Sequence, residues 1–144
     1  MSVADILKRK GTVVKTVRPD ESVETFARLL RKEGIGAMVV KNADGSIAGI
    51  ISERDLAYGL ATHGSNLGHL EVSELMTKAV ITCSPSDSLS QIMKVMTERR
   101  IRHLPVLDGQ ALVGIVTIGD VLKFRLEETQ MEAAVLRDYA IARG

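Results

Sequence analysis

The chain has 144 residues, 45% of them hydrophobic and 26% charged, the composition of a globular protein long enough to bury a core. Its formal net charge of +1 excludes the strong basic excess of a non-specific nucleic-acid binder, so nucleic acid is not an expected partner. No apolar run is long enough for a signal peptide or a bilayer span, so we expect a cytoplasmic protein with no membrane partner.

The first half of the sequence predicts a short helix followed by a β-α-β-β-α unit. Ser2 is a favourable N-cap for a helix over residues 3–9. A strand over residues 12–17 then leads to a helix that Ser22 caps and Gly34 ends, with apolar residues at helical spacing between them. The remaining predicted elements are a hairpin of residues 37–40 and 46–51, a helix of about residues 53–63, and a glycine-rich linker, residues 64–68.

The second half repeats this order of elements. Its predicted elements are a first strand at residues 80–82, a helix carrying Leu89, Ile92, Met93 and Met96, and a hairpin of residues 104–107 and 111–116. The offset between copies is 66 from Pro19 to Pro85 and 65 from Asp55 to Asp120, so one residue is lost between them. The loss falls in the hairpin turns, where a change of length costs least.

Each copy alone is too short to bury a core, so we expect the two copies to share one. The expected fold class is α/β (α+β), with two tandem β-α-β-β-α repeats in a pseudo-twofold sandwich. The repeats divide the sequence into residues 1–68 and 69–144. This arrangement predicts equivalent clefts between the copies.

The last predicted helix, from about residue 119 to residue 143, is longer than its counterpart in the first copy. The residues that step along it by four and three are Leu122, Leu126, Thr129, Ala133, Leu136 and Ala140. This spacing is typical of a coiled-coil seam, so we expect the helix to pack on a partner helix in a homodimer. The alternative is that the seam packs back on its own domain.

The cysteine and two of the histidines carry no predicted chemistry. Cys83 is the only cysteine, which excludes an intramolecular disulfide and favours a buried, inert thiol. His63 and His69 have no partner at metal-ligand spacing, so no metal site is expected.

Each copy ends in a hydroxyl residue, two spacers and an aspartate: Ser52 with Asp55, and Thr117 with Asp120. A carboxylate can accept both hydrogen bonds of a ribose cis-diol, and a hydroxyl at a helix start lies among unpaired amide donors that suit a phosphate. The same pattern is also a capping box. Capping and ligand binding are compatible, and two copies at the same place favour a ligand role in at least one cleft.

The repeated sequence resembles the CBS-domain pair, also called the Bateman module, over about residues 10–123. The resembling segments are GIGA at 34–37 and GIISERD at 49–55 in the first copy, and MT at 76–77, RHLPV at 102–106 and LVGIVTIGD at 112–120 in the second. The first copy departs from the second in having Val39 where the second has Pro105.

The resemblance implies an adenosyl ligand in the clefts between the repeats: AMP first, then ATP or NAD(H), with no catalytic cofactor. Its ribose would lie on the motif's aspartate, its phosphate near the hydroxyl residue and its adenine between apolar strands. One cleft would comprise Thr117, Asp120, Ile115 and Gly119 with Thr12, Val13, Lys15, Ile35, Gly36 and Ala37. The other would comprise Ser52, Arg54, Asp55 and Ile50 with Lys78, Val80, Ile81, Ile101, Arg102 and His103.

The two clefts are not expected to be chemically equal. Arg102 and His103 would bring charge to the Ser52 cleft, where Gly36 and Ala37 bring none to the Thr117 cleft, so extra phosphates should favour the Ser52 cleft. The alternatives are a solvated, dipole-favoured helix end for the arginine and a packing role for the histidine.

The expected function is that of a homodimeric regulatory sensor that binds an adenine nucleotide and acts on an unknown regulated protein. An enzyme is not expected, because the sequence has no Gly-x-Ser-x-Gly, His-Glu-x-x-His or Walker motif. The alternative is a ligand-free dimeric structural or interaction module. A thermal shift with adenosyl ligands discriminates between them, since a ligand that binds the native protein alone raises the melting temperature.

Overall fold

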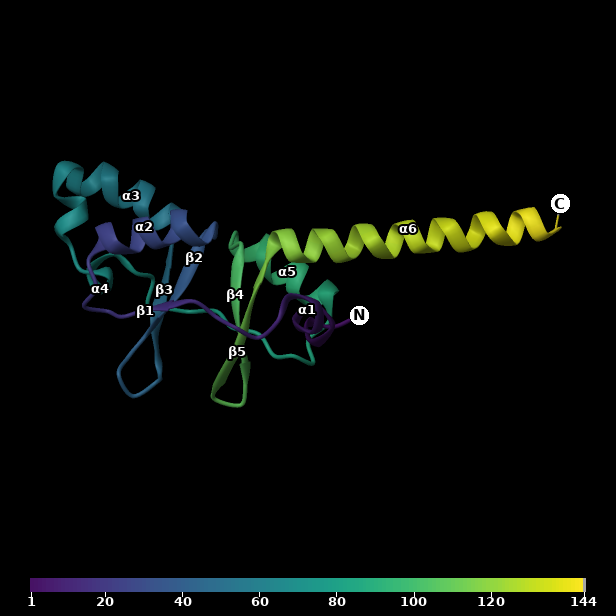
Figure 1. Ribbon diagram of the computed structural model, residues 1–144, viewed down its shortest axis with the longest axis horizontal. Helices are drawn as coiled ribbons and strands as arrows, with labels where there is room; N and C mark the ends of the chain where they lie inside the picture. The colour runs from purple at the N-terminus through teal and green to yellow at the C-terminus, as the bar shows by residue number, and fades with distance from the viewer. Residues whose placement is uncertain (144) are drawn as a thin grey trace. The chain divides into compact units, whose positions relative to one another are not determined.

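The computed structural model describes residues 1–143, which form helices and short strands, including two β-hairpins (Figure 1). The mixed α+β fold class is confirmed. The chain divides into two compact units, Val13–Ile81 and Met1–Thr12 together with the chain from Thr82 onward. We call them the first-repeat unit and the second-repeat unit.

The first-repeat unit is built around a three-stranded sheet. Its elements are β1 (Thr16–Val17), α2 (Val23–Glu33), β2 (Ala37–Lys41), β3 (Ile47–Ser52), α3 (Glu53–His63), the 3-10 helix η1 (Gly64–His69) and α4 (Val72–Leu75). β1 is parallel to β2, and β2 is antiparallel to β3. The hairpin and the helix at residues 53–63 are therefore confirmed, whereas the predicted linker at 64–68 is a 3-10 helix.

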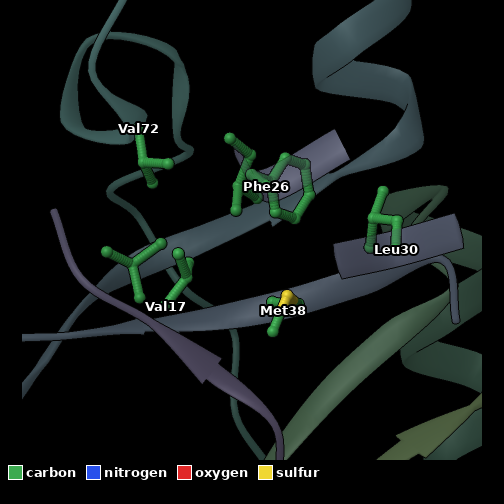
Figure 2. Close-up of a cluster of buried hydrophobic side chains, with 7 residues drawn as sticks. Val17, Phe26, Leu30, Met38 and Val72 are labelled. Carbon is green, nitrogen blue, oxygen red and sulfur yellow. The ribbon is translucent and has the colours of Figure 1, made fainter. Parts of the chain in front are cut away.

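One buried face of α2 forms the core of this unit against the sheet. Phe26 and Leu30 project from α2 towards Met38, and Val17 and Val72 close the same cluster (Figure 2). The helix begins where it was predicted to begin, because the Ser22 hydroxyl accepts a hydrogen bond from the Thr25 amide at 3.1 Å. It ends at Gly34, whose φ of 65° lies in the left-handed region that favours glycine.

The second-repeat unit has equivalent helices and an equivalent hairpin, but its sheet has two strands. Its elements are α1 (Val3–Lys10), α5 (Leu89–Arg99), the antiparallel pair β4 (His103–Asp108) and β5 (Ala111–Thr117), and α6 (Ile118–Arg143). Its α5 ends at Arg100, which has a φ of 54° at the position that Gly34 holds in the first copy.

The first strand predicted at residues 80–82 is wrong. The chain instead makes a single parallel bridge, in which the Cys83 amide donates to Pro105 O at 3.0 Å and Leu107 N donates to Cys83 O at 2.9 Å. Extending this ladder backwards needs an N–H at Pro105, which a proline lacks. In the first copy Val39 stands at that position and pairs with Thr16, although the predicted strand over residues 12–17 is likewise shortened to Thr16–Val17.

The segment before each repeat packs on the other repeat's unit. In the first-repeat unit the Val72 amide donates to Glu21 O at 2.8 Å, and in the second-repeat unit the Val3 amide donates to Asp87 O at 2.9 Å. Helices α4 and α1 therefore occupy equivalent places. The predicted boundary at 68/69 divides the repeats along the sequence. In the compact units, the segment before the second repeat belongs to the first-repeat unit, and the segment before the first repeat belongs to the second-repeat unit.

Helix α6 is 26 residues long, which corresponds to about 39 Å. Its first turns are anchored by the buried Val121 and Phe124. Every described residue from 129 to 142 is exposed, and Figure 1 shows the helix continuing past the other elements of its own unit. The predicted seam is thus uncovered within this unit, and exposed Met131 and Val135 lie on the opposite side of the helix from it.

Gly49 and Gly114 lie where the segments that precede the repeats contact the sheets. The two positions differ in what an added Cβ would meet. A Cβ at Gly49 would lie 2.6 Å from the backbone oxygen of Thr77, whereas a Cβ at Gly114 would lie 2.4 Å from the side-chain Cδ2 of Leu7. A leucine side chain can rotate away, but a paired backbone carbonyl cannot move without breaking its bridge.

We therefore expect Gly49→Ala to lower the free energy of unfolding by about 2–3 kcal/mol and Gly114→Ala by about 1 kcal/mol. Urea denaturation of the two variants measures the difference. Equal losses, or a larger loss for Gly114→Ala, would contradict the role assigned to the Thr77 carbonyl.

The buried thiol is confirmed: Cys83 is 8% exposed. Burial, together with the smaller effect of the neighbouring Asp87 carboxylate, raises the pKa of Cys83 to about 12. At pH 8 the folded protein should therefore hold a protonated, unreactive thiol. Iodoacetamide should alkylate Cys83 at least ten-fold more slowly in the native protein than in 6 M urea, as followed by mass spectrometry; equal rates would show that the site opens freely.

Candidate functional site

The two Ser/Thr-x-x-Asp motifs occupy equivalent places, each at the junction between a strand and the helix that follows it. Ser52 ends β3 and caps α3, and Thr117 ends β5 immediately before α6. Core-facing Ile51 and Val116 are fully buried, whereas Ile50 and Ile115, which share the opposite strand face with the motif hydroxyls, are half-buried. Each motif thus lies beside a partly exposed apolar strand face.

Local hydrogen bonds fix the orientation of Asp120. Its Oδ2 accepts a hydrogen bond from Thr117 N at 2.9 Å, and its own amide donates to Thr117 Oγ1 at 3.1 Å. Lys10, at the end of α1, donates from Nζ to the same Oδ2 at 2.8 Å and to Ile115 O at 2.9 Å.

Asp55 is held in the same way by its own motif. Its Oδ2 accepts from Ser52 N at 2.9 Å, and its amide donates to Ser52 Oγ at 3.5 Å. Its other oxygen, Oδ1, accepts from the Thr77 hydroxyl at 3.3 Å. The Thr77 backbone also pairs with Ile50, donating to its oxygen at 2.8 Å and accepting from its amide at 3.0 Å.

Both motifs are therefore capping boxes, which was the alternative interpretation of their sequence pattern. Capping uses one carboxylate oxygen of each aspartate and leaves the second oxygen at the edge of the strand face. A carboxylate can accept hydrogen bonds from a cis-diol, and the amide donors at a helix start can bind a phosphate. The arrangement holds both kinds of group in fixed positions.

Each unit brings part of the predicted site residues together. In the second-repeat unit the Ile118 amide donates to Arg102 O at 2.9 Å, and His103 pairs with Thr117. In the first-repeat unit the Glu53 amide donates to Gly36 O at 3.0 Å, and Ala37 pairs with Ser52. The backbones of these residues thus adjoin the motif of their own repeat.

The remaining predicted walls come from the other copy. The residues expected to wall the Thr117 cleft, apart from Thr12, lie in the first-repeat unit; Ile101, Arg102 and His103, expected in the Ser52 cleft, lie in the second-repeat unit. Their contribution across the repeats stays a prediction. Two of the residues expected to wall the Thr117 cleft have other surroundings in their own unit. Lys15 Nζ lies 3.9 Å from Glu33 Oε2, and the Val13 side chain is exposed.

The sequence reasoning missed Lys10 and Thr77, whose side chains contact the motif aspartates from outside the motif. They occupy the segments that precede the two repeats, and those segments pack on the other repeat's unit. For Thr77 the sequence did offer a signal, because the Met76-Thr77 segment is part of the family resemblance. We did not connect this segment with the carboxylate of Asp55. Lys10 has no such signal, because its contact depends on how the segment before the first repeat packs.

A surface hollow of about 510 Å³ lies beside the Ser52 junction in the first-repeat unit. Its lining residues are Ala27, Leu30, Arg31, Gly34, Ile35, Gly36, Glu53 and Leu56. It therefore lies between α2 and α3, on the helical side of this unit. Among residues 1–143 no cluster of three or more potential ligands could hold a metal ion, and none of the described helices is long and apolar enough to cross a membrane.

The chain belongs to the CBS-domain family, which it matches over residues 3–62 and 72–127. The crystal structure of a CBS-domain-containing protein from Agrobacterium tumefaciens is similar, with a TM-score of 0.85 and 44% sequence identity, and the match covers 86% of this chain and 92% of that one. Recognition of the chain as a CBS-domain pair is thereby confirmed.

Two further similar structures contain ligands. The CBS domain pair of a protein solved with 5′-methylthioadenosine and S-adenosyl-L-methionine has a TM-score of 0.77 and 28% identity, with 86% of this chain and 98% of that one covered. A CBS-domain protein solved with AMP has a TM-score of 0.74 and 26% identity, with 89% and 98% covered. Among the first curated relatives, the chain spans from 31% to 71% of the matched protein's length.

Proposed function

We propose that this CBS-domain pair is a regulatory module that binds an adenosyl ligand, AMP first and then ATP or NAD(H). The observation that carries the proposal is the fixed carboxylate at each strand-to-helix junction, beside a half-buried apolar strand face. Solved relatives with AMP, 5′-methylthioadenosine or S-adenosyl-L-methionine support the ligand class. The groups at each junction support the same ligand class. The aspartate carboxylate suits the ribose diol, the helix start suits the phosphate, and the apolar strand face suits the adenine ring.

In the proposed mode the ribose diol lies on the motif aspartate and the phosphate lies near the helix start. The α3 and α6 N-termini supply amide donors and a partial positive charge, which favour an anion. Ile50 and Ile115 offer apolar surface, which suits adenine in a chain with only 3% aromatic residues. Arg102 and His103 stay proposed contacts of the phosphate, as the resemblance implies.

The proposed action is regulatory and not catalytic. The relatives that are inosine-5′-monophosphate dehydrogenases are much longer, and this chain spans 21% of one of them. Ligand would hold the two repeats in one mutual orientation and so shift the population that an unknown regulated protein recognises. The cytoplasm is the proposed location, and neither a catalytic cofactor nor a metal takes part.

Ribose recognition is tested by removing either side of the diol–carboxylate contact. Asp120→Asn and Asp55→Asn keep a capping acceptor but lose the charge, so the variant at an occupied site should lose about 1.5–3 kcal/mol of AMP affinity, the range for hydrogen bonds to a charged group. Isothermal titration calorimetry measures this loss, and 2′-deoxy-AMP should lose a similar amount on the unsubstituted chain.

The matched control is Asp138→Asn, which makes the same charge change at an exposed position on α6. Its affinity for AMP should equal that of the unsubstituted chain. If the double variant Asp55→Asn/Asp120→Asn binds AMP normally and the deoxy ligand binds as well as AMP, the motifs are helix caps alone and the chain is a ligand-free interaction module.

We also propose that the chain forms a homodimer. Exposed apolar side chains on α3 and α6 support this, because stretches of that size on a monomer favour aggregation unless a partner covers them. They are Tyr58, Leu60, Ile118, Leu122, Leu126, Met131, Val135, Leu136, Tyr139 and Ile141. A second copy is the proposed partner, since twofold dimers are the commonest solution and the same stripe is present on both chains.

Multi-angle light scattering should give twice the 15.6 kDa monomer mass at micromolar concentration. Leu136→Glu places a charge in the seam and, by symmetry, affects both copies, so the dissociation constant should rise at least ten-fold. Gln130→Glu adds the same charge at another exposed position on α6 and should change it less than two-fold. A monodisperse monomer of the unsubstituted chain would contradict the dimer.

A further inference from the structure

Lys10 places a full positive charge on the carboxylate of one motif. Its Nζ lies 2.8 Å from Asp120 Oδ2 and 2.9 Å from Ile115 O. The two side chains are 35% and 24% exposed, so the pair is partly shielded from water and still open to a solute. The ammonium therefore sits among the groups that the proposed site offers to a ribose.

The other motif has a neutral group at the corresponding place. Ile50 and Ile115 are equivalent residues, and the carbonyl of Ile50 accepts from the Thr77 amide at 2.8 Å, where that of Ile115 accepts from Lys10 Nζ. The Thr77 hydroxyl lies 3.3 Å from Asp55 Oδ1. The two motifs thus differ by one charge at the point of contact with their aspartate.

The position of Lys10 is fixed by its neighbour in sequence. Arg9 forms an ion pair with Glu127, and its guanidinium lies 4.8 Å from the centroid of the Phe124 ring. Phe124 is buried, so the last turn of α1 is held against the first turns of α6. This keeps the backbone of Lys10 beside the first turns of α6, within reach of Asp120.

A diol that uses both carboxylate oxygens of Asp120 must share Oδ2 with Lys10 or displace the ammonium from it. A displaced ammonium loses a charge-assisted hydrogen bond, and a neutral nucleoside offers no anion in return. A 5′-phosphate lies a few bonds from the diol and can accept from the same ammonium. A ligand with a positive charge near the ribose would instead be repelled.

We propose, on the basis of the proposed adenosyl site, that Lys10 makes the Thr117/Asp120 site selective for 5′-phosphorylated adenosyl ligands over neutral or cationic ones. The sequence-based expectation that the two clefts differ in charge compared Gly36 and Ala37 with Arg102 and His103 and did not include Lys10. The Asp55 site, with the Thr77 hydroxyl, lacks this source of selectivity.

The test compares AMP with adenosine on the whole chain carrying Asp55→Asn, which leaves the Asp120 site as the one with an intact carboxylate. Calorimetry should give AMP at least a ten-fold tighter dissociation constant than adenosine. Adding Lys10→Gln should reduce this ratio at least ten-fold, mainly by weakening AMP. Adding Lys8→Gln, which removes the same charge from an exposed position on α1, should change the ratio less than two-fold.

The outcomes separate this inference from the proposed function. If Lys10→Gln keeps its melting temperature and its AMP-to-adenosine ratio, Lys10 has no selective role although the adenosyl site stands. If Asp55→Asn abolishes binding that the unsubstituted chain shows, the Asp120 site binds no ligand and the inference falls alone. If the unsubstituted chain binds neither AMP nor adenosine, the proposed function falls and the inference with it.

Discussion

The capping box at each strand-to-helix junction is the interaction on which the candidate site depends. Ser52 N and Thr117 N each donate to Oδ2 of their aspartate at 2.9 Å, so neither carboxylate is free to rotate. A carboxylate held in this way needs no reorganisation before it meets a diol, which lowers the entropic cost of binding. In the proposed mode helix capping and ligand recognition use the same residues, so a substitution at either aspartate should affect stability and affinity together.

The exchange of preceding segments gives each site its second layer. Lys10 and Thr77 reach the aspartates because α1 and α4 pack on the other repeat's unit, close to Gly114 and Gly49. In the second-repeat unit, the last turn of α1 contacts both the motif and α6. A ligand that moves Lys10 therefore acts on the turn that also holds the base of the exposed helix, which gives the proposed regulation a physical connection to the surface of the chain.

Local rules in the sequence predicted most of the helices and both hairpins. Ser22 and Gly34 bound α2 as their capping chemistry requires, and α3 spans the predicted residues. The strand at residues 80–82 failed because Pro105 removes the hydrogen bond that would extend the ladder past Cys83. Pro105 is visible in the sequence, but its effect could be predicted only by knowing which strand lies beside residues 80–82.

The motifs at the candidate site were predictable, because a repeated pattern marks them at two equivalent places. The partners of their carboxylates were not. Lys10 is 110 residues from Asp120 in sequence, and no local pattern links them. Similarly, spacing identified the α6 seam, whereas the exposure of Met131 and Val135 on the opposite side follows from how little of α6 packs on its own unit.

A crystal structure of the chain grown with AMP tests the central claim most directly. We predict that the ribose 2′ and 3′ hydroxyls lie within 3.2 Å of the Asp120 or Asp55 carboxylate, with the phosphate at the start of the helix that follows. At the Asp120 site the Lys10 ammonium should contact the phosphate. AMP bound away from both motifs, or with its ribose directed away from both aspartates, would contradict the account.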